Sequence, residues 1–201
     1  MQAAFTGGKL GGPGNEVEID ETFIGGKSRN MHVDRRERKI PGAGPAGKTA
    51  VMGLLERHGQ VRLKVVPNVR RHNLEPIIRE NVETGTTIYT DALKSYDCLD
   101  YLQDYNHQVI DHAEAYAKGN VHTNGLENFW CLLKRGIKGT YVSVEPFHLF
   151  RYLDEQAFRF NNRTPELGDS GRFVMAMQQI VGRRLTYKEL TGKTEQADGV
   201  S

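Results

Sequence analysis

Residues 122–136 read His122-Thr-Asn-Gly-Leu-Glu-Asn-Phe-Trp-Cys-Leu-Leu-Lys-Arg-Gly136. Apolar residues recur here at helical spacing, which predicts an amphipathic helix with one buried stripe. The stripe consists of Leu126, Phe129 or Trp130, Leu133 and Ile137. Thr123 or Asn124 can cap the start of this helix by accepting a hydrogen bond from a backbone N–H. Gly136 and Gly139 are expected to end it.

The same helix carries an acid and a base on one side. Glu127 and Lys134 are seven positions apart, close to two helical turns, so they project in nearly the same direction. About 10 Å along the helix axis separates them, which is too far for a direct ion pair. This spacing suits a large shared ligand, such as a metal-bound phosphate and the next phosphate along a chain.

Composition describes an ordinary globular protein. With 201 residues, 26% of them charged and 8% aromatic, the chain is one medium domain or one domain with appendages. The net charge of +2 says little about partners. Basic residues do cluster at 27–39 and 183–188. For each cluster alone, a solvated loop or face is a simpler explanation than DNA binding.

The sequence also indicates a cellular compartment. Cys98 and Cys131 are too few for a disulfide framework or a four-ligand zinc site, and they suit a reducing cytosol. No apolar run is long enough to span a membrane, and the residues near Met1 lack the apolar core of a signal peptide. We therefore expect a cytoplasmic protein without a membrane partner.

Outside the central helix, strand-like and helix-like segments alternate. Residues 1–15 are Gly-rich and expected to be poorly ordered. Apolar residues alternate with acids in 16–25, which predicts a half-buried strand. Asn73 is the expected cap of a helix that Gly85 closes. The remaining expected elements are a long loop at 27–47, a hairpin of 49–57 and 60–66, a strand at 86–91, a short helix within 92–105, a strand at 107–112, and helices at 145–161 and 173–180. This order predicts an α/β fold, a mixed sheet with helices on its faces.

Three acids occupy positions where a site can form. Asp20 lies within or at the end of the first strand, Asp91 ends a later strand, and Glu127 begins the central helix. Asp20 and Asp91 converge if their strands are neighbours, because sites in such sheets form beyond strand ends. Converging carboxylates repel one another. Mg²⁺ or Mn²⁺ relieves that repulsion with oxygen ligands, and two such ions can clamp a phosphodiester.

Each acid also has a purely structural explanation. An acid at a strand end is most often a turn residue or a cap. A Glu near a helix N-terminus is favoured by the helix dipole without any further role. For one acid alone the structural explanation comes first, and only the set of three, with Lys134 two turns beyond Glu127, favours chemistry.

Four segments carry a family resemblance. They are Val17-Glu-Ile-Asp-Glu-Thr-Phe-Ile-Gly-Gly-Lys27, Ile88-Tyr-Thr-Asp-Ala-Leu-Lys-Ser-Tyr96, residues 122–141 and residues 148–163. Together they resemble the integrase-like domain of bacterial insertion-sequence transposases of the ISXO-like type, over about residues 16–163. The resemblance implies a ribonuclease-H-like fold and DDE-type DNA cleavage and strand transfer.

Site residues follow from the resemblance position by position. It implies that Asp20, Asp91 and Glu127 are the catalytic, metal-binding residues, with two Mg²⁺ or Mn²⁺ ions. Asn124 and Asn128 are rival third positions, and Glu127 is preferred because a carboxylate binds Mg²⁺ better than an amide. Lys134 is expected to contact a DNA phosphate, helped by Arg135 and Lys138. The implied partners are the DNA of the element ends and target, and further copies of the chain in a synaptic homo-oligomer.

Residues 16–165 form the expected catalytic domain, with 1–15 as a flexible N-terminus and 166–201 as a helical extension and polar tail. Many family members carry an N-terminal zinc ribbon, and no Cys-rich segment precedes residue 16 here. This motivates a second hypothesis, an inactive remnant that binds DNA or a partner transposase. A third hypothesis is a related metal nuclease, such as a junction resolvase.

Several other residues have competing interpretations. His112 and His122 are most simply loop residues, although His122 can assist near the scissile phosphate. Trp130 is expected in the core, with stacking on a flipped base as the minority interpretation. Tyr96 and Tyr141 are expected to be packing residues with a polar end. The loop from Lys27 to Lys39 can track a DNA backbone or simply be a flexible charged loop.

Overall fold

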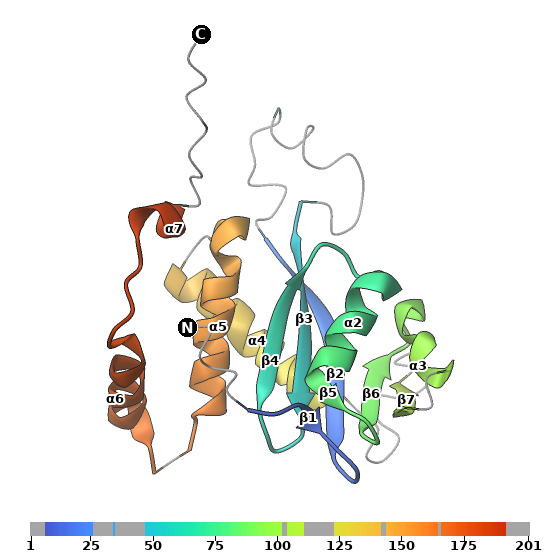
Figure 1. Ribbon diagram of the computed structural model, residues 1–201. Helices are drawn as coiled ribbons and strands as arrows, with labels where there is room; N and C mark the ends of the chain where they lie inside the picture. The colour runs from blue at the N-terminus through green and yellow to red at the C-terminus, as the bar shows by residue number, and fades with distance from the viewer. Residues whose placement is uncertain are drawn as a thin grey trace.

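A computed structural model of the chain describes residues 7–25, 34, 47–101, 104–110, 123–141, 144–164 and 166–191. Its centre is a five-stranded sheet in the order β4-β3-β2-β6-β7 (Figure 1). The strands are β2 (Glu16–Ile24), β3 (Thr49–Glu56), β4 (Val61–Val66), β6 (Thr87–Asp91) and β7 (Asn106–Ile110). β2, β3 and β4 pair antiparallel, whereas β2, β6 and β7 pair parallel. The predicted ribonuclease-H-like mixed sheet is confirmed.

Residues near the N-terminus contribute one strand to a second, two-stranded sheet. β1 (Leu10–Gly11) pairs in parallel with β5 (Val82–Glu83), and the Leu10 side chain is buried in the core. The expectation that the segment before residue 16 is poorly ordered is therefore wrong for β1. Residues 1–6 lie outside the described part of the chain.

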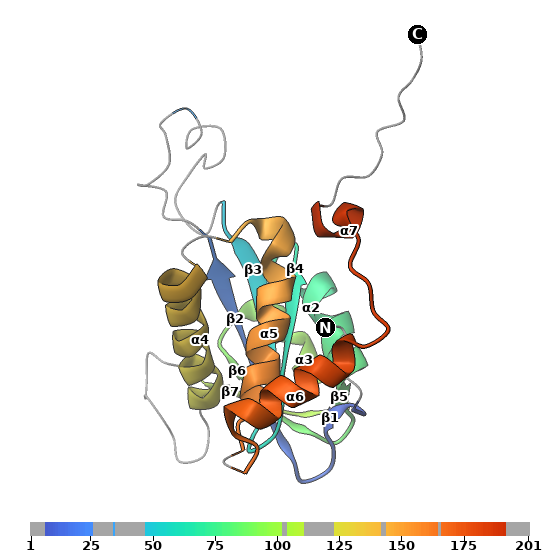
Figure 2. The same cartoon turned by 90° about the vertical axis from the view of Figure 1, so that its left-hand side faces the viewer.

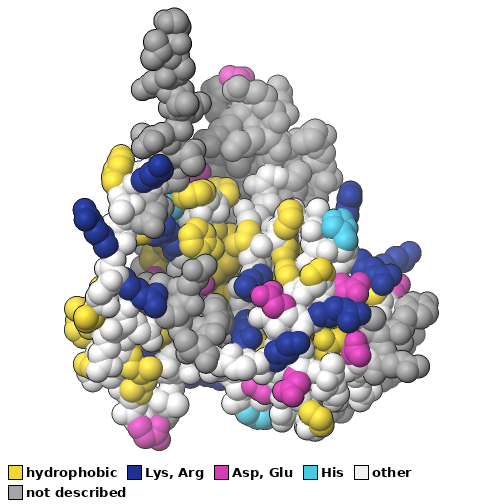
Figure 3. Space-filling model, viewed as in Figure 1, with side chains coloured by type: hydrophobic (Ala, Val, Ile, Leu, Met, Phe, Trp, Pro, Cys, Tyr) yellow, Lys and Arg dark blue, Asp and Glu magenta, His cyan; other side chains and the backbone are white. Residues whose placement is uncertain are grey.

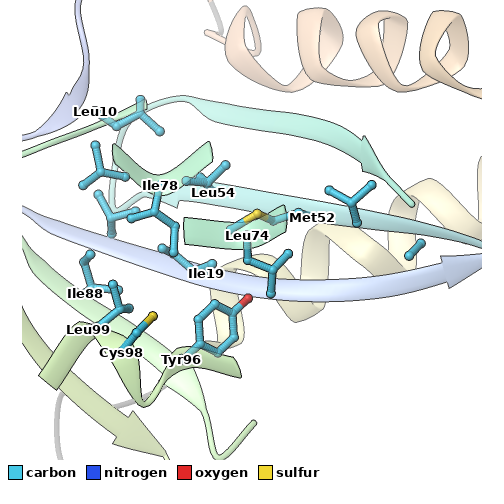
Figure 4. Close-up of a cluster of buried hydrophobic side chains, with 14 residues drawn as sticks. Leu10, Ile19, Met52, Leu54, Leu74, Ile78, Ile88, Tyr96, Cys98 and Leu99 are labelled. Carbon is cyan, nitrogen blue, oxygen red and sulfur yellow. The ribbon is translucent and has the colours of Figure 1, made fainter. Parts of the chain in front are cut away.

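Helices cover both faces of the sheet. On one face lie α2 (Arg71–Asn81), the 3₁₀ turn η3 (Lys94–Tyr96) and α3 (Cys98–Tyr101). They enclose an apolar core that includes Ile19, Leu54, Leu74 and Tyr96 (Figure 4). On the other face lie α4 (Asn124–Gly136) and α5 (Leu149–Asn161) (Figure 2). Because β2 is covered on both sides, Glu18, Thr22 and Ile24 are buried on its second face, Glu18 with only 1% exposed, so the expectation of a half-buried strand is wrong. The other acids of the strand, Glu16, Asp20 and Glu21, are partly exposed.

The start of α2 differs from the prediction. The helix begins at Arg71 after Arg70, not at an Asn73 cap, and Pro76 lies inside it. The Asn73 amide instead donates a hydrogen bond to the Asn68 side chain over 2.7 Å. The helix ends at Asn81, and β5 intervenes before Gly85, so Gly85 does not close it.

The central helix has the predicted stripe, since Leu126, Phe129, Trp130, Leu133 and Ile137 are all buried. α4 ends at Gly136 as expected. The chain then continues directly into a π-helical turn, η4 (Ile137–Tyr141), so Gly139 does not terminate the helix.

The C-terminal helices lie outside this two-faced core. A 3₁₀ turn, η5 (Pro146–His148), precedes α5, and Phe147 and Phe150 are exposed. α6 (Gly168–Ile180) lies beyond α5 as seen from the sheet and has no buried residue, and α7 (Tyr187–Thr191) follows (Figures 1 and 2). None of the helices in the described ranges combines the length and apolarity that a membrane span needs.

Candidate active site

The sheet brings two of the predicted acids together. β2 and β6 pair from Glu16 opposite Thr87 to Glu18 opposite Tyr89. Extending that register by two residues puts Asp91, the last residue of β6, across from Asp20. Residues opposite one another in a parallel pair project to the same face. Asp20 lies inside β2 and not at its end. It pairs there with Gly53 of β3.

Two hydrogen bonds orient the Asp20 carboxylate. The Glu21 backbone N–H donates to Oδ1 over 2.8 Å, and the Trp130 indole Nε1–H donates to Oδ2 over 2.9 Å. Trp130 is a core residue as predicted, but its link to Asp20 was not anticipated. A usable signal does exist in the sequence, because a buried indole N–H needs an acceptor and an acid is the strongest one available.

Gly53 allows this contact. A Cβ atom on Gly53 would lie 2.6 Å from Cζ2 of Trp130 and 2.9 Å from Cδ2 of Leu126. Real Cβ atoms do not come this close to ring carbons, so any larger residue would push α4 away from the sheet. Gly53 lies directly opposite Asp20, at the place where Trp130 reaches the carboxylate.

Asp91 and Glu127 both lie within electrostatic reach of Asp20. Burial raises the pKa of the Asp20 carboxyl above its ordinary value, and the negative charges of Asp91 and Glu127 raise it further. The hydrogen bonds from Glu21 and Trp130 act in the opposite direction and lower this pKa, but the net shift is upward. Glu127 is exposed in the first turn of α4, so its side chain can change rotamer without disturbing the core.

Electrostatic reach is not the same as a formed metal site. Across the described ranges, no three His, Cys, Asp or Glu side chains are gathered closely enough to hold a metal ion together. The metal-binding role of Asp20, Asp91 and Glu127 therefore stays a prediction. The rival residues Asn124 and Asn128 are both exposed on the same helix, and their positions do not exclude either of them.

Glu21 is a fourth acid at this place that the sequence did not single out. Tyr96 donates a hydrogen bond from its hydroxyl to the Glu21 carboxylate, which confirms the prediction that Tyr96 packs with a polar end. Burial, followed by the charges of Asp91 and Asp20, raises the pKa of Glu21 to about 8. Tyr141 has a similar polar end, since its hydroxyl donates to Glu155 over 2.7 Å.

The start of α4 is not capped as predicted. Within the described residues, the Thr123 side chain makes no cap hydrogen bond, and Asn124 is already helical. The Leu126 backbone N–H instead donates to Oε2 of Glu18 over 2.9 Å. The cap comes from a strand 108 positions away, so no local sequence pattern could reveal it.

The predicted DNA-binding residues are solvent-accessible. Lys134 and Arg135 lie in the last turn of α4, and Lys138 lies in η4, all three exposed. By contrast, acids and bases alternate over α2 on the opposite face of the sheet (Figure 3), where Arg71 and Arg79 both pair with Glu75. The predictions for His112, His122 and the basic loop from Lys27 to Lys39 fall outside the described residues, apart from Asp34 within that loop.

Comparison with known proteins identifies the family. Residues 9–161 match the family model of the ISXO2-like transposase domain. An uncharacterised transposase-like protein of Haemophilus influenzae is 40% identical over 98 residues, which cover 49% of this chain and 78% of that protein. An uncharacterised protein in transposable element ISH50 of Halobacterium salinarum is 28% identical over 133 residues, covering 59% of this chain and 43% of that protein.

A solved structure is similar at lower identity. The catalytic core domain of BIV integrase aligns with a TM-score of 0.46 and 13% identity, over 82% of this chain and 94% of that one. The order and direction of the strands, not this likeness, establish the fold. The family match begins at residue 9, so it includes β1 as part of the domain. The chain belongs to the ISXO2-like transposase domain family.

Proposed function

We propose that this chain is a DDE-type transposase catalytic domain, which cleaves DNA at the ends of an insertion sequence and joins the freed 3′-hydroxyl to target DNA. The observation that carries the proposal is the register of β2 and β6, which aligns Asp20 with Asp91, together with a pKa of Asp20 that responds to Glu127. Family membership supports the same chemistry.

The donor set fits a hard divalent cation. Asp20, Asp91 and Glu127 supply carboxylate oxygens, the ligands that Mg²⁺ and Mn²⁺ prefer. The charges of Asp91 and Glu127 raise the pKa of Asp20, which indicates mutual repulsion that a cation would relieve. When bound, two ions would activate the attacking oxygen and stabilise the leaving oxygen of the phosphodiester.

The chain's own groups prepare this site. The Trp130 and Glu21 N–H groups hold the Asp20 carboxylate in one orientation, so little reorganisation is needed on binding. Lys134, two turns beyond Glu127 on the exposed side of α4, would contact a DNA phosphate, with Arg135 and Lys138 nearby along the backbone. A homo-oligomer of the chain would hold the two element ends together.

Asp91→Asn tests the proposal. The substitution keeps the shape of the side chain and removes the charge that a cation needs. We expect strand transfer from element-end DNA to be abolished, while circular dichroism and DNA affinity stay close to wild type. Unchanged strand transfer would overturn the proposal. Hydrolysis of DNA by the wild-type chain without any joined product would favour a metal nuclease instead.

A non-catalytic remnant is the second candidate. The observation in its favour is that the acidic side chains in the described ranges are not already gathered into a metal site. Mn²⁺ titration separates the two candidates. Saturable binding that is lost in Asp20→Ala supports the enzyme, whereas wild-type binding no stronger than that of Asp20→Ala supports the remnant.

A further inference from the structure

The N-terminus of α4 is attached to β2 at two points. Leu126 donates its backbone N–H to Glu18, and Trp130 donates its indole N–H to Asp20. The two acceptors are two residues apart on β2 and project to the same face of the sheet. Glu127 lies between the two donors in sequence. The position of its backbone is therefore set from both sides.

Glu18 is itself held rigidly. Its side chain is 1% exposed, and its Oε1 accepts a hydrogen bond from Arg57 Nε over 3.0 Å. Arg57 also donates to Glu16 over 2.9 Å and stacks on the Tyr89 ring, with its guanidinium carbon 4.1 Å from the centroid. The Tyr89 hydroxyl closes the network by donating to Glu16 over 2.7 Å. Glu18 thus sits in a buried, charge-compensated network with little freedom to move.

The first turn of α4 packs closely against the Glu18 carboxylate. A Cβ atom on Gly125 would lie 2.7 Å from Oε2 of Glu18 and 2.6 Å from Cδ2 of Leu55. Gly125 therefore allows the first turn of α4 to approach β2. A local Ser or Thr cap would satisfy the free N–H equally well. Only an acceptor from β2 also connects the helix start to the strand that carries Asp20.

We propose that Glu18 is a positioning residue, which fixes the backbone of Glu127 at the place from which its carboxylate can reach a metal ion shared with Asp20 and Asp91. The inference rests on the proposed function, in which Glu127 is a metal ligand. Glu18 touches neither DNA nor a metal; it acts through the first turn of α4. Groups that orient ligands in this way typically change metal affinity by about 10- to 100-fold when they are removed.

The test uses Mn²⁺ alone as the probe, with binding measured by electron paramagnetic resonance and by fluorescence of the chain's one tryptophan, Trp130. Glu18→Ala removes the acceptor, and Glu18→Gln keeps an oxygen for the Leu126 N–H. Glu16→Ala is the matched control, because Glu16 accepts from the same Arg57, whereas the Leu126 N–H of α4 donates to Glu18. We expect Mn²⁺ affinity to fall about tenfold or more in Glu18→Ala, to recover partly in Glu18→Gln, and to stay near wild type in Glu16→Ala.

A double-mutant cycle separates positioning from general destabilisation. In a Glu127→Gln background, Glu18→Ala is expected to lower Mn²⁺ affinity no further, while its effect on urea unfolding persists. If Glu18→Ala does not fold, Glu18→Gln takes its place in the cycle. Wild-type affinity in the Glu18 variant, a fully additive loss with Glu127→Gln, or an equal loss in Glu16→Ala would each overturn the inference.

The same measurements distinguish this inference from the function on which it rests. If the wild type binds no Mn²⁺, so that Asp91→Asn shows no loss of binding, the proposed function is wrong. The positioning role of Glu18 is then wrong as well. If Asp91→Asn loses binding while Glu18→Ala does not, only the positioning role is wrong.

Discussion

At the residue scale, the Trp130 side chain both packs in the apolar core and orients a candidate metal ligand, Asp20. Its ring is buried between α4 and β3, where it contacts the Phe129 ring, and its indole N–H donates a hydrogen bond to Asp20. A hydrogen bond to a charged group contributes about 2 kcal/mol to stability. The indole also lowers the pKa of Asp20 against the upward effect of burial, which favours the ionised form of the carboxyl group.

Trp130→Phe isolates the hydrogen bond from the packing. Phe retains most of the apolar bulk but has no N–H. We expect the free energy of unfolding to fall by about 2 kcal/mol and Mn²⁺ affinity to weaken, because the Asp20 carboxylate is less favoured and less well oriented. Phe129→Leu is the control, because Phe129 belongs to the same apolar cluster and its ring has no N–H or O–H to donate. Mn²⁺ affinity equal to wild type in Trp130→Phe would contradict the role of the indole.

The raised pKa of Glu21 predicts that the stability of the metal-free protein depends on pH. Its pKa is raised from an ordinary 4.5 to about 8 in the folded state, so between these values the unfolded chain binds fewer protons than the folded chain. Stability therefore falls as pH rises through this window, by up to about 1.4 kcal/mol per pH unit. Below pH 4.5 both states hold the proton and this penalty vanishes.

Glu21→Gln should remove that penalty. Compared with wild type in EDTA, we expect the variant to gain stability steadily from pH 5 to pH 8, and the gain to level off above it. Urea unfolding at several pH values measures the difference. A difference in unfolding free energy that is the same at pH 5 and pH 8 would show that Glu21 ionises normally in the folded protein.

At the scale of elements, the close approach of α4 to the sheet depends on Gly53 of β3. Gly53→Ala would place a methyl group 2.6 Å from the Trp130 ring, so α4 must shift. Overpacking of this kind typically destabilises by about 1–3 kcal/mol. Because the shift moves Trp130 and Glu127 together, we expect Mn²⁺ affinity to fall as well.

Gly139→Ala is the matched control, since a Cβ atom there meets no described atom within 4 Å. Urea unfolding and Mn²⁺ titration of both variants test the prediction. Equal stability of Gly53→Ala and Gly139→Ala would show that α4 tolerates displacement, and the tight approach would then have no functional meaning.

The same elements show which structural features local sequence patterns can predict. The stripe of α4, the β3–β4 hairpin and the strand ending at Asp91 were predictable because each depends on local periodicity. The cap of α4 was not, because its acceptor, Glu18, lies 108 positions away. Glu18 looked like the solvent side of an alternating strand. Only the docking of α4 makes that side of β2 a second buried face.

For the candidate site, Asp20, Asp91 and Glu127 were singled out from their places on strands and a helix and from the family resemblance, and their catalytic role stays a prediction. The surrounding residues were missed, because Trp130, Gly53 and Glu21 act through contacts with distant segments. Residue type and local spacing identify groups that can do chemistry, whereas the groups that orient them depend on the tertiary fold.

At the scale of the whole molecule, the two faces of the sheet carry different charge patterns. The α2 face alternates bases and acids in ion pairs (Figure 3), while α4 and η4 present Lys134, Arg135 and Lys138. DNA phosphates are attracted by positive charge, and on the α2 face Glu75 compensates part of the charge of Arg71 and Arg79. The face of α4 is therefore the expected DNA surface.

Lys134→Ala tests that assignment. Loss of one phosphate contact should weaken DNA binding across all sequences and reduce the slope of log affinity against log salt by about 1. Arg71→Ala removes the same charge from the α2 face and serves as control. Fluorescence anisotropy with labelled duplex over a range of salt concentrations measures both. An equal change in slope for the two variants would place the DNA elsewhere.

The central claim is that one pair of ions is shared by carboxylates from β2, β6 and α4. Anomalous diffraction from crystals of the full chain with Mn²⁺ tests it most directly. We expect two manganese peaks, both bordered by oxygens of Asp20, Asp91 and Glu127, with the Asp20 carboxylate still bonded to Trp130. Manganese bound elsewhere, or coordinated by Asn124 or Asn128 in place of Glu127, would contradict it.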